Sequence, residues 1–119
     1  MTAAWVGTVC SDPPMVSVSV RPSRYSLQFI DSSGEFIVNL TDESMLRAAD
    51  YCGVRSGRDE DKFRACGLTP VPAEGFSFAP AVAESPLCLG CRVRSRQDLG
   101  SHIMFLGEVT WMGDRKSVV

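Results

Sequence analysis

Hydrophobic and polar residues alternate most regularly between Met15 and Val20. A period of two is typical of a β-strand that is buried on one face. The apolar segment from Ala4 to Cys10 also favours a strand, and the paired prolines within 11–14 predict a turn between the two strands, because proline cannot donate to a strand ladder. The inward face of the second strand would consist of Val16, Val18 and Val20.

The pattern then changes to a short helix and a further strand. Ser26 can cap a helix that carries Leu27 and Ile30 on one face and ends near the glycine of "SSGE". The segment "EFIVNL" alternates again and predicts the next strand. Its inner face is predicted to consist of Phe36, Val38 and Leu40.

A second helix and a charged segment come next. Thr41 or Asp42 is expected to cap a helix that ends at Gly53. The helix would carry Met45, Leu46, Ala49 and Tyr51. The segment "RSGRDEDKF" then predicts a charged loop or a helical turn.

The last third of the chain predicts an irregular crossing segment followed by two strands. Prolines recur through 69–85, with Pro86 just beyond, so we expect no long element there. Strands are predicted over 86–95 and 101–112. One face of the last strand would carry Ile103, Phe105, Gly107, Val109 and Trp111. Alternating strands interrupted by two short helices predict a mainly β fold, a mostly antiparallel barrel with helical insertions.

Length and charge limit the classes of function. The 119 residues are expected to form a single domain, 1–119, large enough for a hydrophobic core. The net charge of −2 gives no general attraction to nucleic acid or to an anionic membrane, so any bound anion would be captured locally. No apolar run approaches a membrane span and the amino terminus does not resemble a signal peptide. We therefore expect a cytoplasmic protein.

The segment "RPSRYS" concentrates candidate anion-binding groups where a strand gives way to a helix. Arginine binds phosphate oxygens through two parallel hydrogen bonds, and serine hydroxyls add donors. Arg21, Ser23, Arg24 and Ser26 would form such a cradle. The alternative is a solvated loop with a helix cap, in which the arginines meet nearby acids. The residues alone leave both interpretations open.

A second group of candidate binding residues lies in "SGRDEDKF". Ser56 and Gly57 would offer donors, Lys62 a point charge and Phe63 an apolar wall, which together suit a flat ligand with a polar edge. The alternative is a solvated, charged face, which is the usual role of a charge run.

The cysteines and the histidine indicate no metal site. Five cysteines at irregular spacing are expected to be thiols. In "CLGC", Cys88 and Cys91 would face opposite sides of a strand and could not chelate one metal ion. His102 is the single histidine, and a lone histidine is most often structural.

Four segments resemble those of one protein family. These are "TAAWVGTVCSDPPMVSVSVRPSRYS", "GEFIVNL", "DYCGVRSGRDEDKF" and "GSHIMFLGEV". In this order they resemble the flavin reductase-like, FMN-binding split-barrel family, and above all its flavoredoxin branch. The resemblance implies a Greek-key split barrel, a homodimer, and FMN bound near the subunit interface. It also implies electron transfer from NAD(P)H or a redox partner to the flavin and onward to an acceptor.

The resemblance also suggests roles for individual residues. Arg21, Ser23, Arg24 and Ser26 match the segment that holds the FMN phosphate. Thr2, Ala3 and Trp5 match a strand that passes the isoalloxazine ring, whereas Ser56, Lys62 and Phe63 match the loop that closes over the flavin. His102 resembles a histidine near the flavin and the nicotinamide, which makes it the candidate catalytic residue.

The sequence departs from the family pattern at both ends. Family members normally have at least one strand before the segment that begins here at Met1, and continue beyond a segment like "DRKSVV". We therefore expect a partial domain with an open sheet edge that a partner chain would cover. The alternative to an oxidoreductase is a non-catalytic flavin-binding module or a degenerate fragment of the fold.

Overall fold

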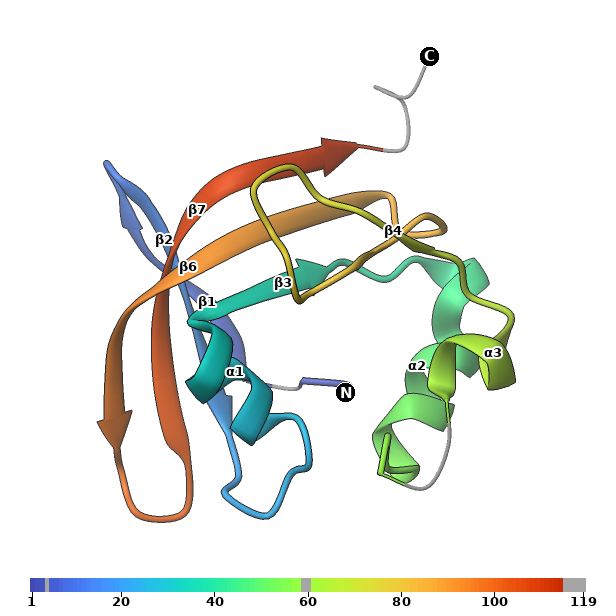
Figure 1. Cartoon of the computed structure of the whole chain (residues 1–119), viewed down its shortest axis with the longest axis horizontal. Coiled ribbons are helices and arrows are strands. Elements are labelled where there is room, and N and C mark those ends of the chain that lie inside the picture. Colours follow the sequence, from blue (N-terminus) through green and yellow to red (C-terminus); the bar gives the residue numbers. More distant parts are fainter. Residues whose placement is uncertain (4, 59–60, 115–119) are drawn as a thin grey trace.

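A curled five-stranded antiparallel sheet forms the main body of the protein (Figure 1). The computed structural model describes residues 1–3, 5–58 and 61–114. The strand order in the sheet is β1-β2-β7-β6-β3. These strands are β1 (Val6–Ser11), β2 (Pro14–Val20), β3 (Glu35–Asn39), β6 (Leu87–Asp98) and β7 (Ile103–Asp114). A separate two-stranded sheet pairs β4 (Pro70–Val71) with β5 (Ala81–Val82).

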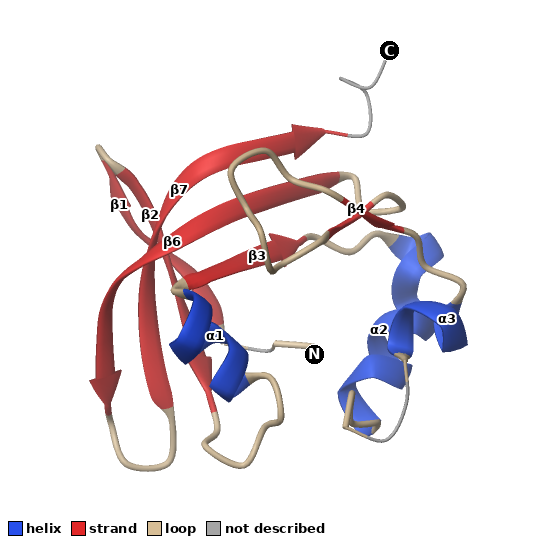
Figure 2. Ribbon diagram, in the orientation of Figure 1, coloured by secondary structure: helices blue, strands red, loops and turns tan. Residues whose placement is uncertain are grey.

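Short helices flank the sheet on two sides (Figure 2). They are α1 (Leu27–Ser33), the 3₁₀ turn η1 (Glu43–Met45), α2 (Leu46–Val54) and α3 (Lys62–Cys66). Helices α2 and α3 lie together, and the amino terminus reaches into the space between them and α1. This arrangement brings Met1 close to Lys62, and both residues line the pocket described below.

The core lies on the inner face of the curled sheet. Val16, Val18 and Val20 are buried, as their alternation predicts, and they pack with Ile103 and Phe105 of β7. Ile30, Phe36 and Cys91 complete the buried cluster. Because Phe36 crosses the sheet so closely, a Cβ atom at Gly107 would lie 2.6 Å from its ring, so only glycine fits there.

Strand β6 extends three residues beyond the predicted limit, to Asp98, whereas β7 has the predicted length of 12 residues but is shifted by two positions, to 103–114. Their register shifts twice, between Gly90 and Cys91 and between Val93 and Ser95. Extra residues of this kind bend a strand and increase its twist, which accounts for the curl of the sheet.

Several predicted element limits are corrected by the structure. Leu40 was predicted to face inward, but β3 ends at Asn39 and Leu40 is 42% exposed. Helix α2 continues through Gly53 to Val54. Ala4, with which the predicted first strand begins, lies outside the described residues. The segment predicted to be irregular contains the two-residue strands β4 and β5.

Strand β1 forms one edge of the large sheet. It pairs with β2, and no strand of the described residues pairs with its other side. All six of its residues are exposed. Within the described ranges, no helix is both long enough and apolar enough to cross a membrane.

Candidate functional site

The segment 21–26, which we call the cradle, winds through two consecutive turns after β2. The backbone N–H of Arg24 donates to the carbonyl of Arg21 at 3.0 Å, and that of Leu27 donates to Arg24 at 3.2 Å. Pro22 occupies the second position of the first turn, where its fixed φ is favourable. Ser26 stands at the start of α1 but makes no side-chain capping bond, so its hydroxyl is not used by the helix.

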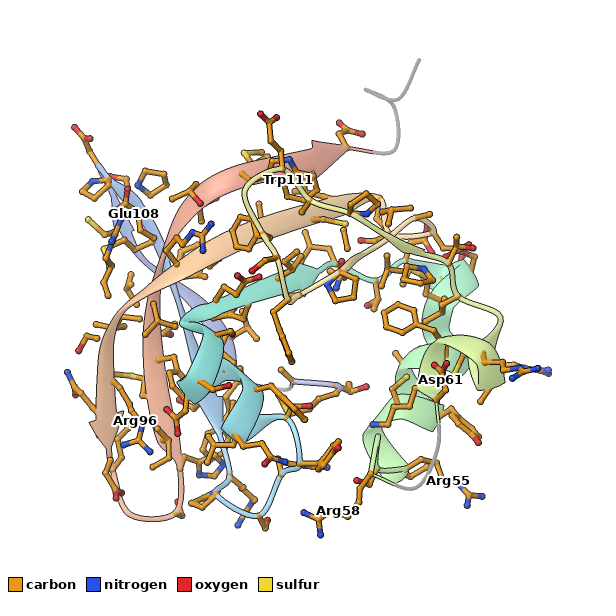
Figure 3. The ribbon with its side chains drawn as sticks, viewed as in Figure 1. Arg55, Arg58, Asp61, Arg96, Glu108 and Trp111 are labelled. Carbon is orange, nitrogen blue, oxygen red and sulfur yellow. The ribbon has the colours of Figure 1, made fainter. Side chains whose placement is uncertain are left out.

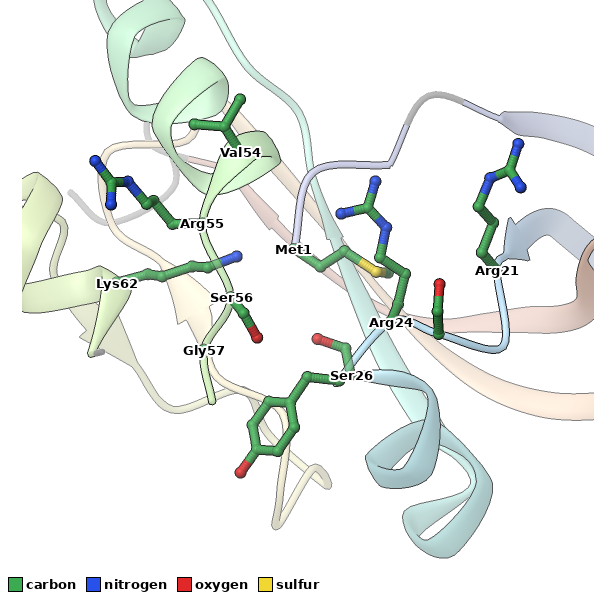
Figure 4. A pocket seen from close by; sticks show the side chains of 11 residues that line it. Met1, Arg21, Arg24, Ser26, Val54, Arg55, Ser56, Gly57 and Lys62 are labelled. Carbon is green, nitrogen blue, oxygen red and sulfur yellow. The ribbon is translucent and has the colours of Figure 1, made fainter. Parts of the chain in front are cut away.

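The cradle forms one wall of a pocket of about 320 Å³ (Figure 4). The other wall, which we call the second wall, comes from the end of α2 and the start of α3. Met1 lies between the two walls. The lining residues are Met1, Arg21, Ser23, Arg24, Tyr25, Ser26, Val54, Arg55, Ser56, Gly57 and Lys62. Segments that are far apart in the sequence therefore present three serines and several cations to one space.

Local hydrogen bonds fix the second wall. The carboxylate of Asp61 caps α3 by accepting the N–H groups of Phe63 and Arg64 at 3.1 and 3.3 Å. The Lys62 ammonium donates to the carbonyl of Cys52 in α2 at 2.7 Å. Lys62 therefore joins α2 to α3 and also lines the pocket.

The pocket concentrates positive charge. Among the described residues, neither Arg21 nor Arg24 makes an ion pair. Partial burial lowers the pKa of the Met1 α-amino group, and the charges of Lys62 and Arg24 lower it further, while Cys52 has the opposite effect. Cations that disfavour one another in this way favour an anion between them.

Tyr25 and Arg58 connect the two walls. The guanidinium of Arg58 lies 5.3 Å from the centre of the Tyr25 ring, within the range of a cation–π interaction. A Cβ atom at Gly57 would lie 3.5 Å from the same ring, so the second wall passes close to the cradle at this point. We call the Tyr25–Arg58 contact the clasp.

The other predicted site residues lie around the pocket and are not part of its lining. Thr2 donates to the carbonyl of Ala49 at 2.6 Å and so holds the amino-terminal segment, including the exposed Ala3, against α2. Phe63 is half-buried in α3. The proposed contacts of these residues with a ligand stay predictions.

Trp5 and His102 stack on each other, with ring centres 4.0 Å apart. His102 is 8% exposed, and its Nδ1 lies 2.9 Å from the Ser101 hydroxyl. Ile103 pairs with Val20, so His102 stands at the same end of the β2–β7 ladder as the cradle. Its predicted place beside a flavin stays a prediction.

Four lining residues were missed by sequence reasoning: Met1, Tyr25, Val54 and Arg55. Tyr25 lies inside "RPSRYS", so its position was a usable signal. Met1 and Val54 carry no such signal, because only the folded chain brings them to the cradle. Arg55, which follows α2 directly, also lies over the ring of Tyr51 at 5.6 Å, so it contacts that helix as well as the pocket.

The described residues contain no cluster of histidine, cysteine and acidic side chains that could hold a metal ion. Cys88 contacts the carbonyl of Val82, whereas Cys91 lies in the core and contacts that of Leu89. The two thiols therefore lie in different surroundings, as the strand alternation predicts.

Comparisons with known proteins agree on one family. Residues 1–118 match the family model described as flavin reductase like domain. Among solved structures, the flavoredoxin of Desulfovibrio vulgaris (Miyazaki F) is 37% identical, with a TM-score of 0.88 over 97% of this chain. The flavoredoxin from Methanosarcina acetivorans is 31% identical, with a TM-score of 0.89 over 98% of this chain.

A curated relative from Archaeoglobus fulgidus is 32% identical over 109 residues, which is 92% of this chain. The chain spans 61% of the length of this relative and 61% of each flavoredoxin chain. The similarity therefore covers almost all of this chain but less than two thirds of those proteins.

Proposed function

Because the chain belongs to the flavin reductase like family and has its split-barrel fold, we propose that it is an oxidoreductase that binds FMN. The observation that carries this proposal is the pocket, in which the cradle and the second wall surround one space with cations and hydroxyls. The ribityl phosphate of FMN is the anion that fits this set of donors. When bound, FMN supplies transfer of electrons and hydride.

The residues of the two walls bind different parts of the ligand. Arg21 and Arg24 neutralise the phosphate through charge-assisted hydrogen bonds. Ser23 and Ser26 supply hydroxyl donors from the same wall. Ser56 and Lys62 hold the polar edge of the ligand from the opposite wall, and Lys62 keeps that wall attached to α2 through Cys52.

A comparison of FMN with riboflavin, which lacks the phosphate, tests this proposal directly. Fluorescence titration of the purified protein should show FMN binding at least roughly tenfold more tightly, because a charged hydrogen bond contributes about 1.5–3 kcal/mol. Competition by inorganic phosphate should weaken FMN binding and leave riboflavin binding unchanged. Equal affinities for FMN and riboflavin would show that the pocket is not a phosphate site.

The electron donor is proposed to be NAD(P)H or a reduced partner protein. Anaerobic addition of NADH or NADPH to the yellow, FMN-loaded protein should bleach the flavin absorption if the protein is a reductase. His102 is the proposed catalytic residue, and H102Q should then slow bleaching while FMN affinity changes less than twofold. An unchanged rate would leave His102 with only its packing role against Trp5.

A second candidate is an electron carrier that does not oxidise NAD(P)H. The similarity to two flavoredoxins favours it, and so does the stacking of Trp5 on His102, which covers the imidazole. A yellow protein that is inert to both nicotinamide cofactors but is reduced by a low-potential chemical donor would support this candidate over the reductase.

A homodimer is part of the same proposal. Its support is the exposed edge strand β1, whose Val9 is 52% exposed, next to Trp5, which is 59% exposed. Uncovered strand edges pair readily with other chains. Sedimentation equilibrium over a range of concentrations should give twice the mass of the chain, whereas a monomer at all concentrations would exclude this arrangement.

A further inference from the structure

Two cysteines that are 14 positions apart come into contact where α2 meets α3. The Sγ atoms of Cys52 in α2 and Cys66, the last residue of α3, lie 3.9 Å apart. No disulfide joins them, and both side chains are partly exposed. A disulfide bond is about 2.05 Å long, so the two sulfur atoms must come closer before a bond can form.

The remaining cysteines have different surroundings. Cys88 and Cys91 are buried, and burial raises the pKa of the Cys91 thiol to about 12, so this thiol stays protonated. Cys10 is exposed on the edge strand β1. Cys52 and Cys66 combine sulfur contact with partial exposure, the two conditions for oxidation within one chain.

The cysteine pair is connected to the pocket. Lys62, which lines the pocket, donates to the backbone carbonyl of Cys52 at 2.7 Å. Ser56 and Gly57 follow α2 by a few residues and line the same pocket. A covalent bond between Cys52 and Cys66 would therefore hold α2 and α3 in the arrangement that forms the second wall.

We propose that Cys52 and Cys66 form a reversible dithiol–disulfide pair that fixes the second wall of the pocket. The oxidant is a low-molecular-weight disulfide. The thiolate of one cysteine attacks a sulfur of this disulfide, breaking its S–S bond and releasing one thiolate. The second cysteine thiolate then attacks the protein sulfur of the mixed disulfide, forming the Cys52–Cys66 bond and releasing the other thiolate.

The atoms and electrons of this exchange balance. The two cysteine thiols lose two protons and two electrons, and the small disulfide gains them to become two thiols. Formation of the bond does not depend on the identity of the pocket's ligand. Its effect on FMN rests on the proposed function: a second wall that is already ordered should bind FMN about three- to tenfold more tightly.

Peptide mapping of the full chain tests the bond. The protein is equilibrated in mixtures of glutathione and glutathione disulfide, quenched with acid, alkylated and digested with trypsin. Cleavage after arginine releases Cys52 in peptide 48–55 and Cys66 in peptide 65–92. In oxidised samples we expect these peptides to be linked, with the loss of two hydrogen atoms, and dithiothreitol should separate them.

Matched variants assign the link. Peptide 65–92 also contains Cys88 and Cys91, so fragment spectra must place the bond at Cys66. The link should disappear in C52S and in C66S and persist in C10S. Alkylated or singly glutathionylated cysteines at every ratio, without a Cys52–Cys66 link in the wild-type protein, would overturn the proposal whether or not the variants fold.

FMN titrations of the oxidised and reduced wild-type protein test the effect on the pocket. The oxidised form should bind about three- to tenfold more tightly, and the C52S and C66S variants should not respond to the oxidant. If the link forms and the affinities are equal, the bond does not fix the wall and the proposal is overturned. If neither form binds FMN, the proposed function fails while the mapped link still stands.

Discussion

Two regions of the protein are rich in arginine, and they differ in how the arginines are compensated. The arginines of β6 all meet acids, and Figure 3 labels one member of two of these pairs, Arg96 and Glu108. These pairs are Arg92 with Glu35 at 3.5 Å, Arg94 with Glu108 at 2.9 Å, and Arg96 with Asp31 at 2.7 Å. The cradle arginines, Arg21 and Arg24, have no acidic partner among the described residues and line a pocket instead.

The difference separates arginines that are paired with acids from the arginines that we propose to bind a ligand. On β6, the ion pairs connect β3, β7 and α1 to the same strand, so an acid of the same chain compensates the charge of each arginine. In the cradle, Arg21 and Arg24 line the same pocket as Lys62, and the charges of Arg24 and Lys62 lower the pKa of the Met1 amino group there. Removing a β6 arginine should therefore affect stability, whereas removing a cradle arginine should affect binding.

The largest expected effect is on the paired side, at Glu35. This carboxylate is 4% exposed and accepts the N–H groups of Phe78 and Ala79 at 3.2 and 2.9 Å as well as pairing with Arg92. Glu35→Ala removes these bonds at once and should lower the free energy of unfolding by about 3 kcal/mol. Urea denaturation measures the loss.

The matched variant is Glu35→Gln, which keeps an oxygen acceptor and should lose less stability than Glu35→Ala. FMN affinity, measured where both variants are folded, should stay within twofold of the wild-type value. A large loss of affinity in Glu35→Gln at full stability would break the separation between the two regions.

Arg24→Ala is expected to give the next largest effect, this time on binding. The variant loses one charge-assisted bond to the phosphate, about 2 kcal/mol or roughly thirtyfold in the FMN dissociation constant. Its stability should change by less than about 0.5 kcal/mol, because Arg24 makes no ion pair with the described residues. If fluorescence titration shows an unchanged FMN affinity, the cradle does not bind the phosphate of FMN.

The fold follows from the sequence where alternation is strong. The valines of β2 were correctly assigned to the core, and the mainly β split-barrel class was confirmed. The limits of β3 and of β6 and β7 were less predictable. Leu40 continues the alternation of β3, but pairing with β6 ends at Asn39, and the bulges that curl the sheet have no clear signal in the residue pattern.

The site follows from the sequence only in part. "RPSRYS" predicts a cradle because arginines and serines are adjacent in the chain, and the fold brings it to Ser56 and Lys62. Contacts between distant segments carry no local signal. The stacking of Trp5 on His102 and the approach of Cys52 to Cys66 depend on sheet register and helix packing, which periodicity does not specify.

The clasp gives a smaller expected effect and tests whether the walls of the pocket act together. Arg58→Ala removes the cation over the Tyr25 ring and should weaken FMN binding by about 0.5–1 kcal/mol, roughly two- to fivefold. Arg58→Lys keeps a cation and should recover part of the affinity. Stopped-flow measurements should show faster FMN release in Arg58→Ala, and an unchanged release rate would exclude a role for the clasp in binding.

Arg94→Ala should have the smallest effect and serves as the control for Arg24→Ala. Arg94 is the extra residue where β6 bulges against β7, and its side chain is 52% exposed while it pairs with Glu108. Exposed ion pairs contribute about 0.2–1 kcal/mol, because water screens the charges and the long side chains lose freedom. The variant should therefore lose about 0.5 kcal/mol of stability and no FMN affinity.

Salt sharpens this last test. At about 1 M salt the screening length falls to roughly 3 Å, so the stability difference between Arg94→Ala and the wild-type protein should shrink. A double-mutant cycle with Glu108→Ala, measured by urea denaturation at low and high salt, isolates the energy of the pair. Arg94→Ala would contradict this comparison in one way only, by weakening FMN binding as much as Arg24→Ala does. Pairing with an acid would then no longer distinguish a structural arginine from a ligand-binding one. The comparison that supports the cradle as a binding site would then fail.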